Sequence, residues 1–67
     1  MMKRQFTIKE LRARKNKTQK EASEDIGIST PTYCAWENDV SRVPFGMVWK
    51  MAEYYGVTVD EIFLPTT

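Results

Sequence analysis

Gly27 lies between two short segments that both carry helix signals, and it restricts the fold of this chain more than any other residue. Before it, the Thr18 hydroxyl can accept a backbone N–H and Glu21 can reciprocate, which is the capping-box pattern at a helix start. Ala22 and Ile26 are four residues apart and share the apolar face of that helix. Glycine accepts a positive φ at a helix end without steric cost. The pattern predicts a helix that stops in a tight turn at Gly27.

The segment after Gly27 predicts a second short helix. Ser29 or Thr30 caps it, and Pro31 fits just inside the start, where a missing N–H costs nothing. Tyr33 and Trp36 are three residues apart and form its buried face. The side chains left facing outward are Thr30, Pro31, Cys34 and Ala35. Two helices joined by a glycine turn, with small side chains outward on the second, form a helix-turn-helix.

The sequence predicts three more helices around this unit, two of them from capping boxes. Thr7 with Glu10, and Thr58 with Glu61, repeat the capping box. The three helices are expected from about residue 8 to Asn16, from about Pro44 to Tyr55, and from Thr58 to Phe63. The fold class is therefore all-α, with five short helices.

The fourth of these helices has a wider apolar stripe than one buried face needs. Its expected inward residues are Phe45, Val48, Trp49, Met51, Ala52 and Tyr55. Because this stripe is too wide for one seam, we expect Trp49 or Met47 to face a partner instead of the core.

The charged residues are segregated along the chain. Residues 1–20 carry eight basic side chains and one acid, a formal charge of +7, whereas residues 21–67 carry two basic side chains and eight acids, a formal charge of −6. The chain is thus dipolar at a net charge of +1. Such a domain can present a basic face to phosphate, although a charged surface that faces only solvent is the alternative.

The residue types argue against an enzyme or a metal site. The chain has no histidine and a single cysteine, Cys34, so neither a Cys/His zinc site nor a histidine-activated thiol can form. It has no glycine-rich phosphate loop, and we expect no catalytic residue, no cofactor, no metal and no small-molecule ligand. A lone thiol suits a reducing compartment, and no apolar run reaches the roughly 20 residues that span a bilayer. Without a signal-peptide pattern, we expect a cytoplasmic protein with no membrane association.

The helix-turn-helix and its flanks resemble the transcriptional regulators of the phage repressor and Cro type, often called the XRE family. The matching residues are Leu11-Arg12, Thr18-Gln19, Glu21, Gly27 to Ser29, Thr32, Trp36 to Asn38, Ala52, Gly56-Val57 and Asp60 to Phe63. They cover roughly residues 7 to 64, the expected core of a single helix-turn-helix domain over residues 1–67. The resemblance implies a lambda-repressor-like, DNA-binding fold with the helix-turn-helix as helices 2 and 3.

The resemblance also implies which residues bind DNA. Helix 3 would lie in the major groove with its first turn at base edges, while helix 2 crosses the phosphate backbone. The base-contacting positions are Ser29, Thr30, Pro31, Thr32 and Ala35, with Cys34 alongside. The backbone-contacting positions are Gln19 at the start of helix 2, Asn38 and Arg42 after helix 3, and additionally Lys17 and Lys20. An arginine in helix 1 pairs with the glutamate that ends helix 3 in this family, which implies a structural ion pair between Arg12 and Glu37.

The base-contacting residues depart from the family pattern. Family members tend to offer Gln, Asn, Arg or Ser at these places, whereas Pro31 and Ala35 cannot hydrogen-bond through their side chains. Thr30 and Thr32 can contact bases through hydroxyl or methyl groups, and methyl groups suit the thymine C5-methyl. We therefore expect specificity to rest on apolar contact and DNA shape.

The expected function is a sequence-specific transcriptional regulator, a repressor that binds a palindromic operator in double-stranded DNA as a homodimer. Two-fold geometry places the half-sites about 34 Å apart. The candidate dimer contacts are Trp49, Val59, Phe63 and Leu64. One alternative is an antitoxin-like protein that binds a toxin and its own operator. Another is a protein-interaction module of this fold with little DNA affinity, which Pro31 and Ala35 would favour.

Overall fold

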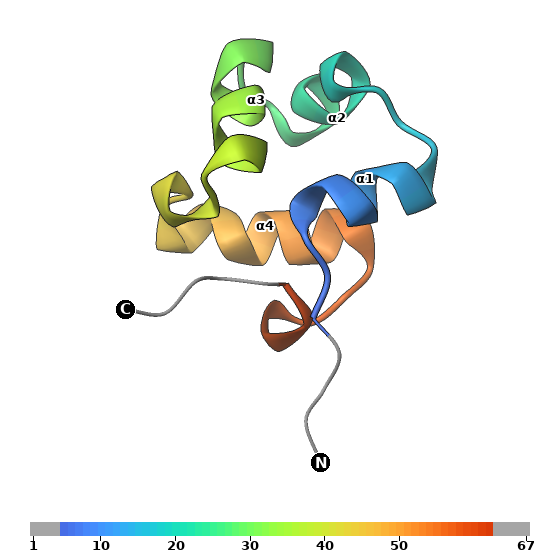
Figure 1. Ribbon diagram of the computed structural model, residues 1–67, viewed down its shortest axis with the longest axis vertical. Helices are drawn as coiled ribbons and strands as arrows, with labels where there is room; N and C mark the ends of the chain where they lie inside the picture. Colours follow the sequence, from blue (N-terminus) through green and yellow to red (C-terminus); the bar gives the residue numbers. More distant parts are fainter. Residues whose placement is uncertain (1–4, 63–67) are drawn as a thin grey trace.

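The computed structural model describes residues 5–62 and contains four α-helices and two short 3-10 helices within that range (Figure 1). In chain order they are α1 (Ile8–Lys15), α2 (Gln19–Ile26), α3 (Thr30–Asn38), η1 (Val40–Arg42), α4 (Phe45–Tyr55) and η2 (Val59–Glu61). The all-α class is confirmed. The long helix α4 lies between α2 and α3 on one side and η2 on the other (Figure 1).

The first two helices begin and end where the capping patterns predict. The Glu10 N–H donates to the Thr7 hydroxyl over 3.1 Å, and the Thr7 N–H donates to the Glu10 carboxylate over 2.9 Å. The same reciprocal pair precedes α2, between Thr18 and Glu21. Asn16 and Gly27 end α1 and α2 in the left-handed region. Gly27 has a φ of 92°, which confirms the tight turn that joins α2 to α3.

The start of α3 shows which of two candidate residues caps the helix. Ser29 is the cap, because its Oγ accepts the Thr32 N–H over 3.3 Å while its backbone is extended. Pro31 follows inside the first turn as expected. Tyr33 and Trp36 point into the core, with 0% and 7% of their surface exposed.

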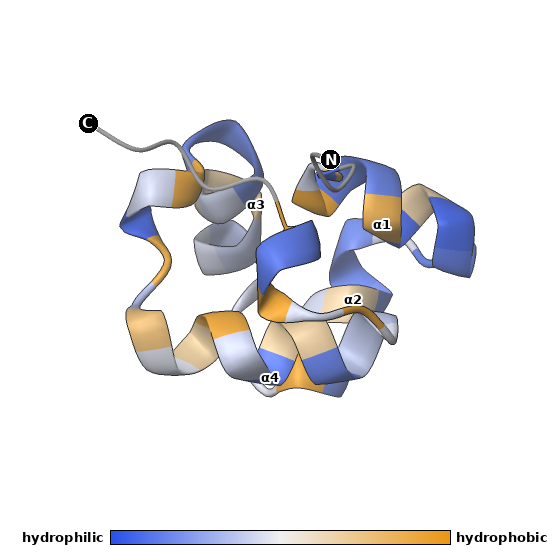
Figure 2. Cartoon of the chain, turned by 90° about the horizontal axis from the view of Figure 1, so that it is seen from below, coloured by the Kyte–Doolittle hydropathy of each residue, from blue (hydrophilic) through white to orange (hydrophobic). Residues whose placement is uncertain are grey.

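The core lies where α4 meets the other helices. Its buried apolar residues are Ile8, Leu11, Ala22, Ile26, Tyr33, Trp36, Val43, Val48, Met51, Ala52 and Ile62. α4 is the most hydrophobic of the four helices, whereas α1 is largely hydrophilic (Figure 2). The buried Tyr33 hydroxyl hydrogen-bonds to the Tyr55 hydroxyl, so its polar tip has a partner inside the core.

The expected fifth helix is shorter than predicted. The capping box at Thr58 and Glu61 is present, but the chain makes only the 3-10 helix Val59–Glu61 before becoming extended at Ile62. Ile62 forms a parallel bridge with Phe6, and the Phe6 N–H donates to the Glu61 carbonyl over 2.7 Å. This pairing ends the helix at Glu61 and joins the two ends of the described range. Phe63, expected to end the helix, lies outside that range.

The inward face predicted for α4 was partly wrong. Val48, Met51 and Ala52 are buried, but Phe45 is 72% exposed and Trp49 is 59% exposed. Met47 is half-buried, so Trp49 is the residue that faces away from the core. The Phe45 and Trp49 rings meet edge to face, with centroids 6.5 Å apart. We call this pair the aromatic face of α4.

Replacing Gly46 by alanine is expected to raise the free energy of unfolding by about 0.5–1 kcal/mol, because glycine costs backbone entropy inside a helix. A Cβ at Gly46 would meet no atom within 4 Å, so nothing opposes the gain. Chemical denaturation measures it. Gly56→Ala is the matched control, and it should instead lower stability by about 1–2 kcal/mol because Gly56 has a φ of 71°. Equal effects of both variants would contradict this account.

Candidate nucleic-acid interface

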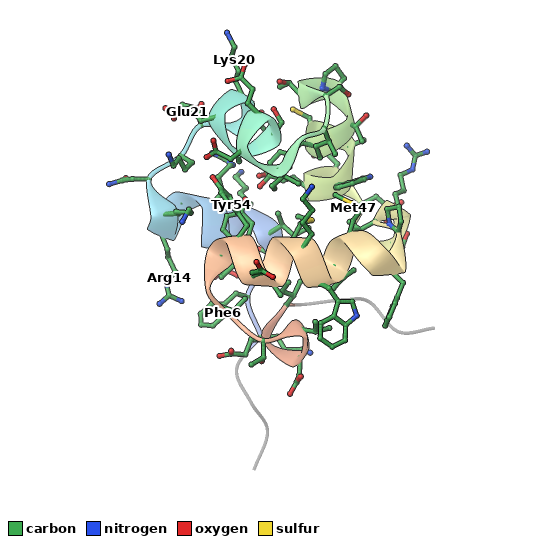
Figure 3. The ribbon with its side chains drawn as sticks, turned by 180° about the vertical axis from the view of Figure 1, so that it is seen from behind. Phe6, Arg14, Lys20, Glu21, Met47 and Tyr54 are labelled. Atoms are coloured by element: carbon green, nitrogen blue, oxygen red, sulfur yellow. The ribbon has the colours of Figure 1, made fainter. Side chains whose placement is uncertain are left out.

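The starts of α2 and α3 lie at one edge of the molecule. α3 begins at the top of the view and descends toward α4 (Figure 1), and Lys20 in the first turn of α2 extends from the same edge (Figure 3). Ser29, Pro31 and Thr32 are exposed in the first turn of α3. This edge therefore presents small side chains from α3 beside a basic side chain from α2.

Buried Ser23 lies where α2 and α3 make their contact. Its side chain is 0% exposed, and its Oγ donates to the Lys20 carbonyl over 2.8 Å. The same oxygen lies 2.9 Å from the Thr30 hydroxyl, and Thr30 is half-buried as a result. The expectation that Thr30 faces outward therefore holds only for part of its side chain.

Two hydroxyl groups in the first turn of α3 are bonded to each other. The Ser29 hydroxyl donates to the Thr32 Oγ1 over 2.7 Å while it accepts the Thr32 N–H. Each hydroxyl carries one proton and two lone pairs. The Thr32 proton is thus available to solvent or to a ligand, whereas the Ser29 proton already has a partner.

A carboxylate at the end of α3 ties the helix-turn-helix to α1. Arg12 donates to Glu37 through Nε over 2.6 Å and through Nη2 over 3.3 Å. A third bond runs from Arg12 Nη1 to the Lys17 carbonyl over 2.9 Å, at the entry to α2. Only 4% of the Glu37 side chain and 17% of the Arg12 side chain are exposed. The two residues form the two-pronged ion pair that the family resemblance implies, and neither is free to bind DNA.

Gln19 belongs to the same network. Its Nε2 donates to the Glu37 carboxylate over 3.0 Å, and its Oε1 accepts the Cys34 thiol over 3.2 Å. A carboxylate can only accept, which explains this orientation of the amide. The side chain of Gln19 is therefore engaged inside the protein. The first N–H groups of α2, at Gln19 and Lys20, have no intrahelical acceptor and can still meet a phosphate.

The hydrogen bonds to the Glu37 carboxylate predict acid sensitivity. Burial alone would raise the pKa of Glu37, but the hydrogen bonds from Arg12 and Gln19 outweigh it and hold the pKa below the ordinary 4.5. A carboxyl whose pKa is lower in the folded state stabilises the fold above its unfolded pKa and loses that contribution as the pH falls. We expect the free energy of unfolding to decline as the pH drops below about 4.5.

Denaturant titrations at a series of pH values measure this decline. Glu37→Gln removes the titrating group but keeps the shape, so its stability should change less with pH than that of the unaltered chain. Parallel curves for the two proteins would assign the acid sensitivity to other carboxylates.

Three basic side chains of α1, Arg12, Arg14 and Lys15, contact other parts of the protein. Arg14 lies over the Phe6 ring at 4.7 Å and points away from the edge that carries Lys20 (Figure 3). Lys15 lies over the Tyr54 ring at 4.8 Å. Arg12 is occupied by Glu37. Part of the +7 charge of residues 1–20 is therefore used in contacts within the protein, which residue counts cannot reveal.

Lys17 also has an internal partner. Its ammonium lies 3.6 Å from the Asp25 carboxylate, which in turn accepts the Tyr54 hydroxyl over 2.6 Å. The hydrogen bond from Tyr54 lowers the pKa of Asp25 against the opposing effect of burial, and the positive charge of Lys17 lowers it further. Lys17 remains 36% exposed and can leave Asp25 for a phosphate at little cost, because exposed ion pairs contribute little.

The remaining predicted contacts lie along and after α3. Cys34 and Ala35 are half-buried, and Asn38 is exposed as the last residue of the helix. Arg42 is exposed in η1, with its Nε 3.9 Å from Asp39. The structure brings most of the predicted base-contacting residues to one end of α3, while Asn38 and Arg42 lie at the other end.

Sequence reasoning missed the hydrogen bond between Ser23 and Thr30 and the internal role of Gln19. A polar residue next to Ala22 on the apolar side of a helix was the available signal for Ser23, because buried hydroxyls require partners. Among residues 5–62, no cluster of His, Cys, Asp and Glu could hold a metal ion, and no helix has the length and apolar character to cross a bilayer.

Comparison with known proteins bears on this arrangement directly. A helix-turn-helix family profile matches residues 8–62. The chain belongs to the phage repressor and Cro type of helix-turn-helix regulators, as the resemblance indicates. This family consists of DNA-binding transcriptional regulators rather than enzymes.

One relative in this family is the cryptic phage CTXphi transcriptional repressor RstR of Vibrio cholerae, 33% identical over 55 residues. The match covers 82% of this chain and 50% of the relative, so the chain spans half the length of that repressor. No solved structure matches the chain.

Proposed function

We propose that this helix-turn-helix regulator is a repressor that binds a palindromic operator in double-stranded DNA as a homodimer, with α3 in the major groove. The observation that carries the proposal is the single edge formed by the first turns of α2 and α3, with Ser29, Pro31 and Thr32 exposed there. A groove about 12 Å wide admits a helix whose first turn carries such small side chains. The similarity to a protein named as a phage transcriptional repressor supports repression over activation.

Recognition would combine few hydrogen bonds with apolar contacts. Pro31 is exposed and Ala35 is half-buried, and both offer only carbon atoms to a base. The Thr32 hydroxyl has a proton available to a base acceptor, and its methyl group suits thymine. Specificity that rests on methyl contacts is reinforced by sequence-dependent DNA shape.

Phosphate contacts would flank the reading helix on both sides. Lys20 and the N–H groups at the start of α2 bind phosphates of one DNA strand. Lys17 can bind there as well once it leaves Asp25. Asn38 at the end of α3 and Arg42 in η1 are both exposed and contact the phosphate backbone there. We expect Gln19 to act mainly by positioning this edge, because its amide is bonded to Glu37 and Cys34.

The aromatic face of α4 is the proposed dimer contact. Phe45 and Trp49 are the large hydrophobic side chains exposed within residues 5–62, and aromatic residues are enriched at interfaces. Trp49 and Val59 line a common hollow between α4 and η2, away from the edge that would meet DNA. Phe63 and Leu64, the other candidate contacts, lie outside the described range.

The exposed aromatic face also favours a second candidate, an antitoxin-like regulator that binds a toxin through the same surface. Self-association distinguishes the two. A chain that stays monomeric at micromolar concentration while it binds its operator would favour the second candidate, because the aromatic face would then be free for a different protein.

The first experiment is retention of genomic DNA fragments by the purified protein across a salt series, followed by sequencing of the retained DNA. We expect one palindromic site. For each neutralised phosphate, the affinity should fall by about 0.9 logarithmic units per tenfold rise in salt concentration. Lys20→Ala should reduce this salt dependence by about the share of one phosphate contact, and the selected sequence should not change. No retention at low salt would refute DNA binding.

A further inference from the structure

We infer that Ser23, which is fully buried and cannot touch DNA, determines which base edges Thr30 can read. The inference rests on the proposed placement of α3 in the major groove. It assigns a specificity role to a residue that lies behind the reading surface, on α2.

The direction of the hydrogen bonds follows from counting protons. The Lys20 carbonyl can only accept, so the bond of 2.8 Å to it uses the single proton of the Ser23 hydroxyl. The 2.9 Å contact between the Ser23 and Thr30 hydroxyl oxygens still needs a proton. Thr30 is the residue that supplies it. The protons therefore run from Thr30 to Ser23 and from Ser23 to the backbone of α2.

This relay leaves Thr30 without a proton to give to DNA. What remains for a base is the two lone pairs of its oxygen and its γ-methyl group. A lone pair accepts from the amino groups of adenine and cytosine, and the methyl group contacts the thymine methyl. The acceptor atoms N7 and O6 of guanine would face an oxygen that cannot donate, so guanine is disfavoured next to Thr30.

The neighbouring side chains of α3 follow the same pattern. The Ser29 proton goes to Thr32 and the Cys34 proton goes to Gln19. Thr32 is therefore the one side chain among these four whose proton is not already given to another protein atom. The reading edge of α3 is poor in donors because internal acceptors take the protons, and not only because Pro31 and Ala35 are apolar.

Ser23→Ala separates this role from simple packing. Alanine fits the same space and favours the helix, so α2 and α3 should keep their contact. The Thr30 hydroxyl then loses its acceptor and becomes free to donate. Selection of binding sites from a randomised operator half-site should show guanine about tenfold better tolerated at the base pair next to Thr30, and other positions unchanged.

Thr30→Val and the double variant complete the test. Valine keeps the shape but removes both donor and acceptor, so Thr30→Val alone should weaken the preference at that base pair. Ser23→Ala should add no further change when valine is present. If Ser23→Ala selects the same bases as the unaltered chain, or if its effect persists with valine at position 30, the inference is wrong.

A DNA-free measurement keeps this test distinct from that of the proposed function. In proton NMR spectra of the free protein, the Ser23 hydroxyl proton should lie close to the Lys20 carbonyl and the Thr30 hydroxyl proton close to Ser23, with slow exchange for both. The opposite direction, with the Ser23 proton on Thr30, would overturn the relay even if DNA binding is observed. A protein that shows the relay but retains no DNA would refute the proposed function and, with it, the specificity role of Ser23.

Discussion

Glu37→Ala is expected to lower the free energy of unfolding by about 3–5 kcal/mol, because it leaves a largely buried guanidinium without its partner. Arg12 would lose both bonds to the carboxylate, and Gln19 would lose the acceptor for its amide. A chain of 67 residues has a total stability of only about 3–10 kcal/mol at ordinary values per residue. Much of the variant should therefore be unfolded at 25 °C, as followed by circular dichroism in denaturant.

Two comparisons show whether this loss comes from burial. Arg42→Ala removes an ion pair whose two side chains are 68% and 55% exposed, and it should change stability by less than about 1 kcal/mol. Combining Arg12→Met with Glu37→Leu should recover much of the stability, because apolar side chains can replace a buried ion pair. A Glu37→Ala loss as small as that of Arg42→Ala would show that the pair contributes little.

Replacing Phe45 and Trp49 together by serine is expected to abolish self-association and weaken operator binding by about 100-fold or more, because two linked reading helices bind far better than one. The fold should survive, since both side chains are mostly exposed. Sedimentation analysis should give a monomer, and titration with labelled DNA should give an unchanged affinity for an isolated half-site.

Ala13→Ser is the control, because Ala13 is exposed on α1 and lies neither in the aromatic pair nor in the hollow that Trp49 and Val59 line. It should leave both the sedimentation and the operator affinity unchanged. If the Phe45/Trp49 variant stays dimeric and binds the operator normally, the dimer uses another surface. If the unaltered protein is itself monomeric, the aromatic face is open to a different partner.

The elements with short-range causes could be predicted from the sequence. The cap of α2 depends on Thr18 and Glu21, which are three residues apart, and Gly27 ends that helix through its own backbone. The cap of α3 was narrowed to Ser29 or Thr30, and the bond from the Thr32 N–H, three residues away, selects Ser29. Such interactions act within one helical turn, so they are readable without knowing what lies opposite.

The elements that departed from prediction have long-range causes. The fifth helix was shortened to η2 where Ile62 pairs with Phe6, from the other end of the chain. Residue spacing could not show which part of the wide apolar stripe of α4 would be covered, and Phe45 and Trp49 were left outside. Residue counts also could not show that three basic side chains of α1, Arg12, Arg14 and Lys15, contact other parts of the protein.

The candidate interface divides in the same way. The sequence by itself predicted the helix-turn-helix, and the family resemblance implied the Arg12–Glu37 ion pair. Of the four side chains expected to face outward on α3, Pro31 is exposed, whereas Thr30, Cys34 and Ala35 are half-buried. Only the tertiary structure decided where the protons of Thr30 and Cys34 go, because their acceptors on α2, Ser23 and Gln19, are 7 and 15 residues away. A hydrogen bond depends on distance and direction in space, and those are set by how α2 packs on α3 rather than by the residue types.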